Sequence, residues 1–197
     1  MSDTPSFKAL LQRVRGGDAE AARELVQRYE PAIRRAVRFR LAESRLARLF
    51  DSMDICQSVL ASFFVRAAVG QYDLEQPEQL LGLLAAMARK KLAFHARAQQ
   101  RQRRDHRRDQ SAGLDERLLA DDGPSPSQYV AGQELLREAE RLLTAEERQL
   151  ADLRKQGLDW GAIAERQGGT PEALRKKLAR AGDRVARQLG LDYLSHE

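Results

Sequence analysis

The stretch that decides the fold runs from residue 159 to residue 188 and reads DWGAIAERQGGTPEALRKKLARAGDRVARQ. Asp159 is a favourable N-cap for a short helix, and Gly168-Gly169 interrupts that helix. Thr170-Pro171 then opens a longer helix, with an N-cap residue followed by proline in the first helical position. A short helix, a tight glycine turn and a longer helix together predict a helix-turn-helix.

The longer helix is expected to be amphipathic and basic. If its apolar residues face inward, the helical period turns Arg175, Lys176 and Arg180 towards solvent. Residues 171–188 hold six Lys and Arg against two acids, a net charge of +4. Such a helix can neutralise phosphates while its first turns approach base edges in the major groove, which favours DNA binding. The alternative is a solvated basic face on an ordinary helical hairpin.

The composition of the whole chain extends the helical prediction beyond this stretch. Asn is absent and Ile and Thr are scarce, whereas Ala, Leu, Arg, Gln and Glu dominate. Strands favour β-branched residues, so this composition predicts an all-α fold. The 197 residues allow one large or two small domains, and 42% apolar residues exclude a fully disordered chain.

Several classes of protein and site are excluded or disfavoured. No run of about 18 apolar residues exists, which excludes a membrane span. The start MSDTPSFKALLQR does not have the pattern of a secretion signal, so we expect a cytoplasmic protein. The single cysteine, Cys56, excludes an internal disulfide and a cysteine-based zinc site. The three histidines, His95, His106 and His196, are far apart in sequence, so we expect no metal or cofactor.

A change in composition divides the chain into two expected domains. Residues 109–133 are rich in Gly, Pro, Ser and Asp and poor in apolar side chains, and residues 109–136 carry a net charge of −5. This composition predicts a flexible acidic linker, holding at most a short helical turn around Leu118-Leu119. It joins a helical domain over residues 1–108 to a second one over residues 134–197.

The first domain should contain four helical segments. Apolar residues at helical spacing from Phe7 to Val14 predict a first helix that ends at Gly16-Gly17. Asp18 caps a longer helix, in which Pro31 predicts a kink or a break. Asp54, followed three residues later by Gln57, has the spacing of a helix N-cap and its partner.

The fourth segment opens at Pro77, after Gly70 has ended the third, and its end is strongly basic. Residues 97–108 hold six Arg and one Asp, a net charge of +5. The run favours nucleic-acid binding, with Phe94 and His95 as the nearby rings that could stack on unpaired bases. A solubilising helix end explains such a run equally well.

No catalytic motif is present. The chain has no phosphate-binding glycine loop, no H-E-x-x-H and no G-x-S-x-G. The carboxylates of Asp51 and Asp54 lie where helix starts favour acids, so capping explains them better than acid–base chemistry. Nothing near Cys56 would lower its pKa, and we expect it to face the core or a partner. The protein is therefore not expected to be an enzyme.

Four stretches, in their order along the chain, resemble the small extracytoplasmic-function (ECF) sigma factors of the bacterial sigma-70 family. GDAEAARELVQRYEPAIRRAVR (17–38) is similar to the family's opening helix. DSMDICQSVLASFF (51–64) is similar to its Asp-Leu-Val-Gln-Glu core-binding helix, with Asp54 and Gln57 in register and Ser58 in the place of Glu. LLAAMARKKLAFHARAQQRQRR (83–104) resembles its promoter-reading helix. LLTAEERQLADLRKQGLDWGAIAERQGGTPEALRKKLARA (142–181) resembles its C-terminal domain.

The resemblance implies a transcription-initiation factor with three binding surfaces. Core RNA polymerase would be bound through Asp54, Gln57 and Ser58. The minus-ten element would be read and opened by Arg89, Lys90, Lys91, Phe94, His95, Arg97 and Arg101. The minus-thirty-five element would be read by Thr170, Arg175, Lys176, Lys177 and Arg180. The implied partners are core polymerase and promoter DNA, and an anti-sigma factor is a further partner that the resemblance admits.

Two other classes of function remain open at this point. One is a stand-alone helix-turn-helix regulator whose N-terminal helices bind a partner or form a dimer. The other is a helical adaptor without a nucleic-acid role, for which the two basic segments have no explanation. Binding to core polymerase distinguishes the first reading from both alternatives.

Overall fold

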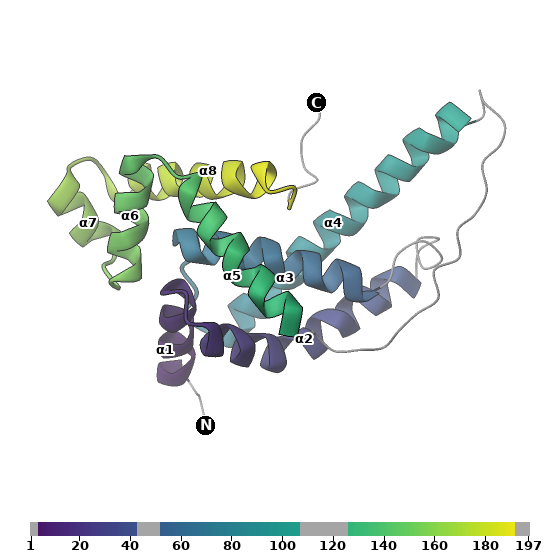
Figure 1. Cartoon of the computed structure of the whole chain (residues 1–197), viewed down its shortest axis with the longest axis horizontal. Helices are drawn as coiled ribbons and strands as arrows, with labels where there is room; N and C mark the ends of the chain where they lie inside the picture. The colour runs from purple at the N-terminus through teal and green to yellow at the C-terminus, as the bar shows by residue number, and fades with distance from the viewer. Residues whose placement is uncertain (1–3, 43–51, 107–125, 192–197) are drawn as a thin grey trace.

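The computed structural model describes residues 4–42, 52–106 and 126–191, and within these ranges the chain is all-helical, as predicted. Figure 1 shows the helices in their order along the chain. They are α1 (Thr4–Arg15), α2 (Ala19–Ala42), α3 (Ser52–Val69), α4 (Pro77–His106), α5 (Pro126–Arg141), α6 (Ala145–Lys155), α7 (Trp160–Gln167) and α8 (Pro171–Gln188). None of the described helices is both long enough and apolar enough to cross a membrane.

The N-terminal half of the chain, α1 to α4, surrounds one apolar core. Phe7 of α1, Leu25 of α2, Phe63 of α3 and Leu84 of α4 are completely buried in it. The ring of Phe63 is stacked on that of Tyr72 at a centroid distance of 5.7 Å. Each helix contributes residues at the helical period predicted from the sequence, so burial of these apolar stripes holds the four helices together.

The starts and stops of these helices agree with most of the predictions. Asp18 caps α2, because its Oδ1 accepts hydrogen bonds from the backbone N–H groups of Glu20 and Ala21, at 2.9 and 3.1 Å. Gly70, in the left-handed region at φ +85°, follows the end of α3. Pro77 occupies the first position of α4.

Two boundaries in the N-terminal half need comment. Of the kink or break predicted at Pro31, the break is absent: helix α2 continues through the proline, because burial of Tyr29 and Ile33 on either side of it outweighs one missing hydrogen bond. Helix α3 already begins at Ser52, so Asp54 lies in its first turn and is not the N-cap. An acid in the first turn is still stabilised by the partial positive charge of the helix N-terminus.

The C-terminal half, α5 to α8, begins earlier than expected. Helix α5 starts at Pro126, inside the stretch 109–133 that the sequence predicts as linker. Residues 107–125, with the turn predicted at Leu118-Leu119, lie outside the described residues, and the division into two domains stays a prediction. Thr144 forms a capping box with Glu147 at the start of α6, and Gly157, at φ +88°, follows its end.

Helix α3 is the element on which both halves pack. Val65 and Val69, near its C-terminus, belong to the apolar cluster of Leu150, Ile163 and Leu178 in the C-terminal half. Figure 1 shows α8 and α5 lying against α3, with α4 extending beyond them. The C-terminal half is therefore docked on the same helix whose other face completes the N-terminal core.

Candidate nucleic-acid interface

The predicted helix-turn-helix consists of α7, a glycine turn and α8. The carboxylate of Asp159 accepts from the backbone N–H of Ala162 at 2.8 Å and caps α7. Gly168 and Gly169 have φ of +79° and +91°, which residues with a side chain rarely adopt. The Thr170 hydroxyl then accepts from the N–H of Ala173 at 3.2 Å and caps α8. The turn is thus built from the residues that the sequence singled out.

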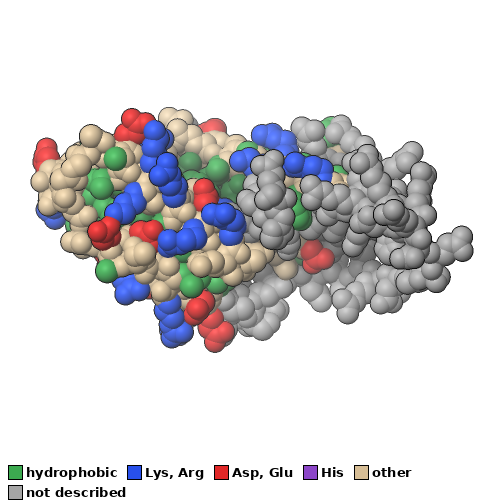
Figure 2. All heavy atoms as spheres, turned by 90° about the horizontal axis from the view of Figure 1, so that it is seen from above, with side chains coloured by type: hydrophobic (Ala, Val, Ile, Leu, Met, Phe, Trp, Pro, Cys, Tyr) green, Lys and Arg blue, Asp and Glu red, His purple; other side chains and the backbone are tan. Residues whose placement is uncertain are grey.

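Helix α8 has the amphipathic arrangement that DNA recognition requires. Leu178, Ala181 and Val185 are buried against the rest of the C-terminal half and against Val65 and Val69 of α3. The predicted minus-thirty-five residues Thr170, Arg175, Lys176, Lys177 and Arg180 are all exposed. Figure 2 shows Lys and Arg side chains spread over the face that includes α8, with fewer acids between them.

The cations of α8 differ in their partners. Lys176 Nζ lies 2.7 Å from Glu172 Oε1, one turn earlier on the same helix, and Lys177 pairs with Glu146 of α6. Arg175 and Arg180 form no ion pair within the part of the chain that the structure describes. Among the predicted minus-thirty-five cations, these two guanidinium groups are therefore the least compensated charges.

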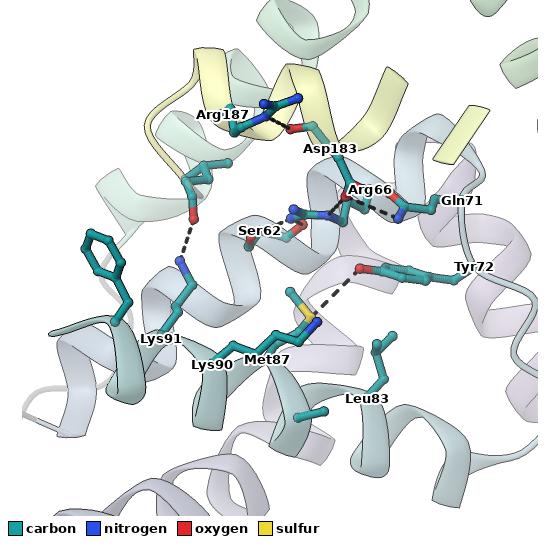
Figure 3. Close-up of a pocket in the computed structure, with 13 residues that line it drawn as sticks. Ser62, Arg66, Gln71, Tyr72, Leu83, Met87, Lys90, Lys91, Asp183 and Arg187 are labelled. Carbon is teal, nitrogen blue, oxygen red and sulfur yellow. Dashed lines mark hydrogen bonds and ion pairs between the residues drawn. The ribbon is translucent and has the colours of Figure 1, made fainter. Parts of the chain in front are cut away.

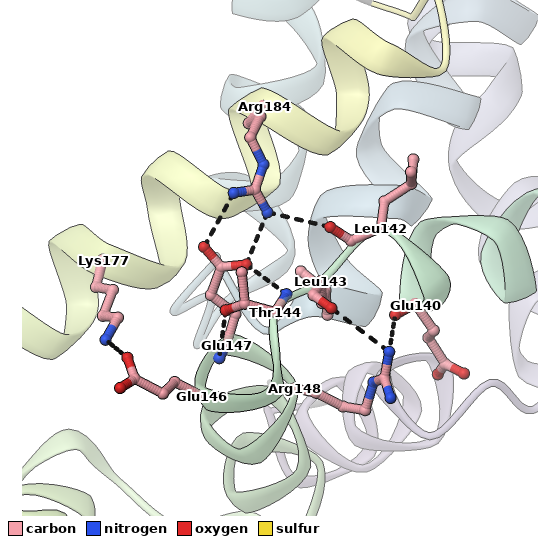
Figure 4. A network of polar contacts seen from close by, with 9 residues as sticks. All are labelled: Glu140, Leu142, Leu143, Thr144, Glu146, Glu147, Arg148, Lys177 and Arg184. Carbon is pink, nitrogen blue, oxygen red and sulfur yellow. Dashed lines mark hydrogen bonds and ion pairs between the residues drawn. The ribbon is translucent and has the colours of Figure 1, made fainter.

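An ion pair between the half-buried Arg184 and the buried Glu147 joins α8 to the start of α6. Arg184 of α8 donates to both carboxylate oxygens of Glu147, at 3.2 and 2.7 Å, and to the Leu142 carbonyl at 3.2 Å (Figure 4). Burial raises the pKa of Glu147, but the hydrogen bonds from Arg184 and from the Thr144 backbone, together with the charge of Arg184, outweigh it. The pKa of Glu147 is thereby lowered. This pair sets the orientation of α8 on its scaffold.

The second predicted DNA-binding surface is the middle and end of α4. Arg89, Lys90 and Arg97 are exposed, and Arg97 donates to the Ala93 carbonyl at 3.2 Å. Phe94 is half-buried. His95 and Arg101 lie within α4, but their side chains are outside the described residues. The exposed cations among these residues form a basic helix surface of the kind that neutralises phosphates.

Lys91 is the exception on this helix, because its side chain is buried and the residue is only 6% exposed. Its ammonium donates to the Ser58 hydroxyl of α3 at 2.7 Å and to the Leu191 carbonyl, beyond the end of α8, at 2.6 Å. In this arrangement Lys91 cannot reach a ligand in solvent. Lys91 follows the buried Leu84 and Ala88 at helical spacing, so it lies on the inner face of α4, whereas its neighbour Lys90 is exposed.

The predicted polymerase-binding residues lie in the first half of α3. Asp54 is exposed and Gln57 and Ser58 are half-buried, whereas Ile55, Cys56 and Val59 face the core. The Ser58 hydroxyl is the acceptor for Lys91, so Ser58 connects this helix to α4, the predicted DNA-binding helix. Cys56 is buried as expected, and burial, followed by the charge of Glu30, raises the pKa of its thiol to about 12.

A cavity of about 530 Å³ is lined by residues of α3, α4 and α8. Lys90 and Lys91 line it from α4, Arg66 from α3, and Asp183 and Arg187 from α8 (Figure 3). Four cations therefore face one carboxylate in this cavity. Among the described residues, no three His, Cys, Asp or Glu side chains lie together in a way that could hold a metal ion.

Sequence reasoning missed the residues that join the two halves. Asp73 accepts hydrogen bonds from Arg154 and from Trp160, at 2.8 Å for the indole, and Arg66 pairs with Asp183. The sequence does contain one signal of this contact, because residues 65–69 are apolar apart from Arg66. In the structure all five of these residues are buried. A helix that is apolar all round is buried on more than one face.

One comparison with known proteins identifies a family. A family model described as ECF sigma factor matches residues 4–190, which include both halves and all three predicted surfaces. No curated protein and no solved structure matches the chain significantly.

Proposed function

Because the chain belongs to the ECF sigma factor family, and is therefore a DNA-binding transcription initiation factor that works with RNA polymerase, we propose how its surfaces divide the task. Helix α8 reads the upstream, minus-thirty-five element as duplex DNA. Helix α4 reads and opens the downstream, minus-ten element. The first half of α3 binds core polymerase.

The assignment of α8 to duplex DNA is supported by its charge and its geometry. A capped, exposed helix after a tight turn can enter the major groove with its first turns, where Arg175 is placed to contact bases. Arg180 lies further along the helix, at a position suited to the phosphate backbone. The uncompensated charge of these two arginines supports direct contact with DNA.

The assignment of α4 to the downstream element rests on its exposed cations and on Phe94. Lys90 and Phe94 line one cavity, so a base taken out of the stack could lie against the ring while the ammonium contacts a phosphate. Arg89 and Arg97 add charge on the exposed side of the helix. Strand opening needs this combination of stacking and electrostatic attraction.

The assignment of α3 to core polymerase rests on Asp54 and Gln57. Asp54 is exposed on a helix whose other side is fixed in the core by Ile55 and Val59. A rigid helix presents a carboxylate and an amide at a defined spacing, which suits recognition of a partner helix with basic and polar side chains.

The observation that carries the proposal is the family match over residues 4–190, since it includes both halves of the chain. The test is reconstitution of the full chain with core polymerase, followed by transcription from a library of promoter fragments. We expect co-purification with the core and initiation from a subset of fragments that share two sequence elements. A stand-alone regulator would instead bind duplex DNA without the core. Absence of both core binding and initiation would show that the proposal is wrong.

A further inference from the structure

One wall of the cavity between α3, α4 and α8 is a single face of α4. The residues of α4 that line it recur at helical spacing, and they are Leu83, Ala86, Met87, Lys90, Lys91 and Phe94. All of them are apolar except the two lysines. This wall therefore combines an apolar surface with positive charges beside it.

The other walls add further positive charge. Arg66 lines the cavity from α3, and Asp183 and Arg187 line it from α8. With the two lysines of α4, four cations face one carboxylate among the described residues, which gives a net charge of +3. Like charges in one cavity repel one another, and an anion that enters relieves this repulsion. The cavity therefore favours a small ligand with several negative charges.

Two of these cations are held in place by the protein itself. Arg66 donates to Ser62 Oγ at 2.6 Å, and its Nε lies 3.2 Å from Asp183 Oδ1. The buried Lys91 donates to the Ser58 hydroxyl and to the Leu191 carbonyl. Both side chains are fixed by these contacts, so they contribute a constant positive potential to the cavity.

The other two cations are available to a ligand. The Lys90 ammonium makes no hydrogen bond or ion pair with a described residue, and Arg187 donates only through Nε, to the Asp183 carbonyl at 3.3 Å. Both residues are exposed. Lys90 comes from α4 and Arg187 from α8, on opposite sides of the cavity (Figure 3). A ligand with two charged groups could therefore engage one cation on each side.

We propose that this cavity binds a free nucleoside diphosphate. The phosphate groups contact Lys90 and Arg187, within the positive potential of Arg66 and Lys91. The base lies on the apolar wall of α4, against the half-buried ring of Phe94. Aromatic side chains stack on any base, because every base has a flat face.

The size and the charge of such a ligand match the cavity. Its volume of about 530 Å³ lies within the roughly 300–1,000 Å³ of sites that bind small molecules. A nucleoside diphosphate carries about three negative charges at pH 7, one on the inner and nearly two on the outer phosphate. This charge balances the net charge of the lining residues. An apolar wall with a few charged groups is also typical of small-molecule sites.

The assignment goes beyond the function proposed above, and only one consequence of it rests on that function. Lys90 and Phe94 belong to the surface that we assign to the minus-ten element, so a bound nucleotide would compete with promoter DNA for both residues. Arg187 lies outside that surface and serves the nucleotide alone. The apparent affinity of α4 for DNA would then fall as the concentration of free nucleotide rises.

The experiment is isothermal titration calorimetry of the full chain with GDP and with ADP. Sodium pyrophosphate carries the charge without the base, and guanosine carries the base without the charge. We expect a one-to-one complex with the nucleotide. Pyrophosphate and guanosine should each bind at least about tenfold more weakly, because each makes only part of the contacts.

Three variants test the residues that we assign. Lys90→Gln and Arg187→Gln each remove an exposed cation and should weaken nucleotide binding at least about tenfold. Phe94→Leu keeps an apolar side chain but removes the ring, so it should weaken nucleotide binding about fivefold or more and leave pyrophosphate binding unchanged. The matched control is Arg137→Gln, which removes the same charge from an exposed position of α5 outside the cavity. It should bind the nucleotide as the wild type does.

Absence of binding by both nucleotides would overturn the proposal. So would pyrophosphate that binds as tightly as GDP, since the cavity would then hold an adventitious ion only. An equal loss in Arg137→Gln would show an effect of net charge and no site.

A mixed-sequence single-stranded 20-mer DNA, titrated into the same variants, distinguishes a free nucleotide from a nucleotide within a promoter strand. If Arg187→Gln weakens binding of the 20-mer as much as that of GDP, the cavity belongs to the strand and the proposal is wrong. None of these measurements uses polymerase, so they can fail while core binding and initiation succeed.

Discussion

Arg184 Nη2 lies 2.7 Å from Glu147 Oε2, and this contact joins the predicted recognition helix α8 to the first turn of α6. The same carboxylate oxygen accepts from the backbone N–H of Thr144 at 2.9 Å, as part of the capping box. The Glu147 side chain therefore satisfies a backbone N–H group at the start of α6 and also fixes the orientation of α8. The Glu147 side chain is 9% exposed, so its charge is only weakly screened.

Replacing Glu147 by glutamine tests the charge separately from the cap. Glutamine can still accept from the Thr144 N–H, but it cannot pair with the Arg184 guanidinium. We expect Glu147→Gln to lower the free energy of unfolding by about 1–2 kcal/mol at pH 7. Urea unfolding followed by Trp160 fluorescence gives this value.

The pH dependence of the same variant follows from the lowered pKa of Glu147. Its contribution to stability is present above its ordinary pKa of 4.5 and is lost as the pH falls through the lower value of the folded state. The difference between wild type and Glu147→Gln should therefore stay constant from pH 7 to about pH 5 and shrink below about pH 4.5. A difference that grows with acid would contradict the assignment.

Local signals predicted most of the helix boundaries in this chain. Asp18, Asp159 and Thr170 are predicted as caps because a short polar side chain before an apolar period has few other roles, and all three accept the expected backbone hydrogen bonds. At Pro31 the predicted break is absent, and α3 begins at Ser52, before the predicted N-cap Asp54. Around Pro31 the flanking residues Tyr29 and Ile33 are buried, and a sequence pattern does not measure the energy of such packing.

The contact between the halves could not be predicted from local patterns. The helical period places Lys91 on the same face of α4 as the buried Leu84 and Ala88, but it does not identify the acceptors of its ammonium, because Ser58 and the Leu191 carbonyl are both distant in sequence. The helical period predicted correctly that Arg175 and Arg180 are exposed. The three binding surfaces themselves remain predictions, since exposure shows that a residue can bind a ligand and not that it does.

Arg175 should contribute more to recognition of the upstream element than Lys177. Because Lys177 is paired with Glu146 and Arg175 has no carboxylate partner in the described part of the chain, less of the lysine charge is available to DNA. Arg175→Ala should weaken binding to the preferred duplex by about 1–3 kcal/mol if it contacts a base. Selection of duplexes from a random library by each variant measures the effect and the change in preference.

The control for this comparison is Arg137→Ala, which removes one positive charge from an exposed position of α5. It should leave both affinity and preference nearly unchanged. A loss for Arg175→Ala that is uniform across sequences, with the salt slope reduced by about 1, would make Arg175 a phosphate contact and not a base-reading residue.

Cys56 should be unreactive in the folded protein. Burial, with a further contribution from the charge of Glu30, raises the pKa of its thiol to about 12, so at pH 8 the reactive thiolate is a very small fraction. Alkylation by iodoacetamide should be slow in buffer and fast in urea, and mass spectrometry is unambiguous because the chain has one cysteine. Equal rates in the two conditions would show that the core around α3 opens freely.

The last prediction concerns core polymerase. Replacing Asp54 and Gln57 by alanine removes an exposed carboxylate and a half-buried amide without touching the buried neighbours Ile55 and Val59. We expect the affinity for core polymerase to fall at least about tenfold relative to the wild type, because one or more charged hydrogen bonds are lost. The circular dichroism spectrum should be unchanged. Glu165→Ala, which removes an exposed carboxylate from α7, is the matched control and should bind normally. Normal binding of the Asp54→Ala, Gln57→Ala double variant would mean that another face of the molecule contacts the polymerase. Reduced binding by the Glu165→Ala control as well would indicate a general effect of net charge and no specific site on α3.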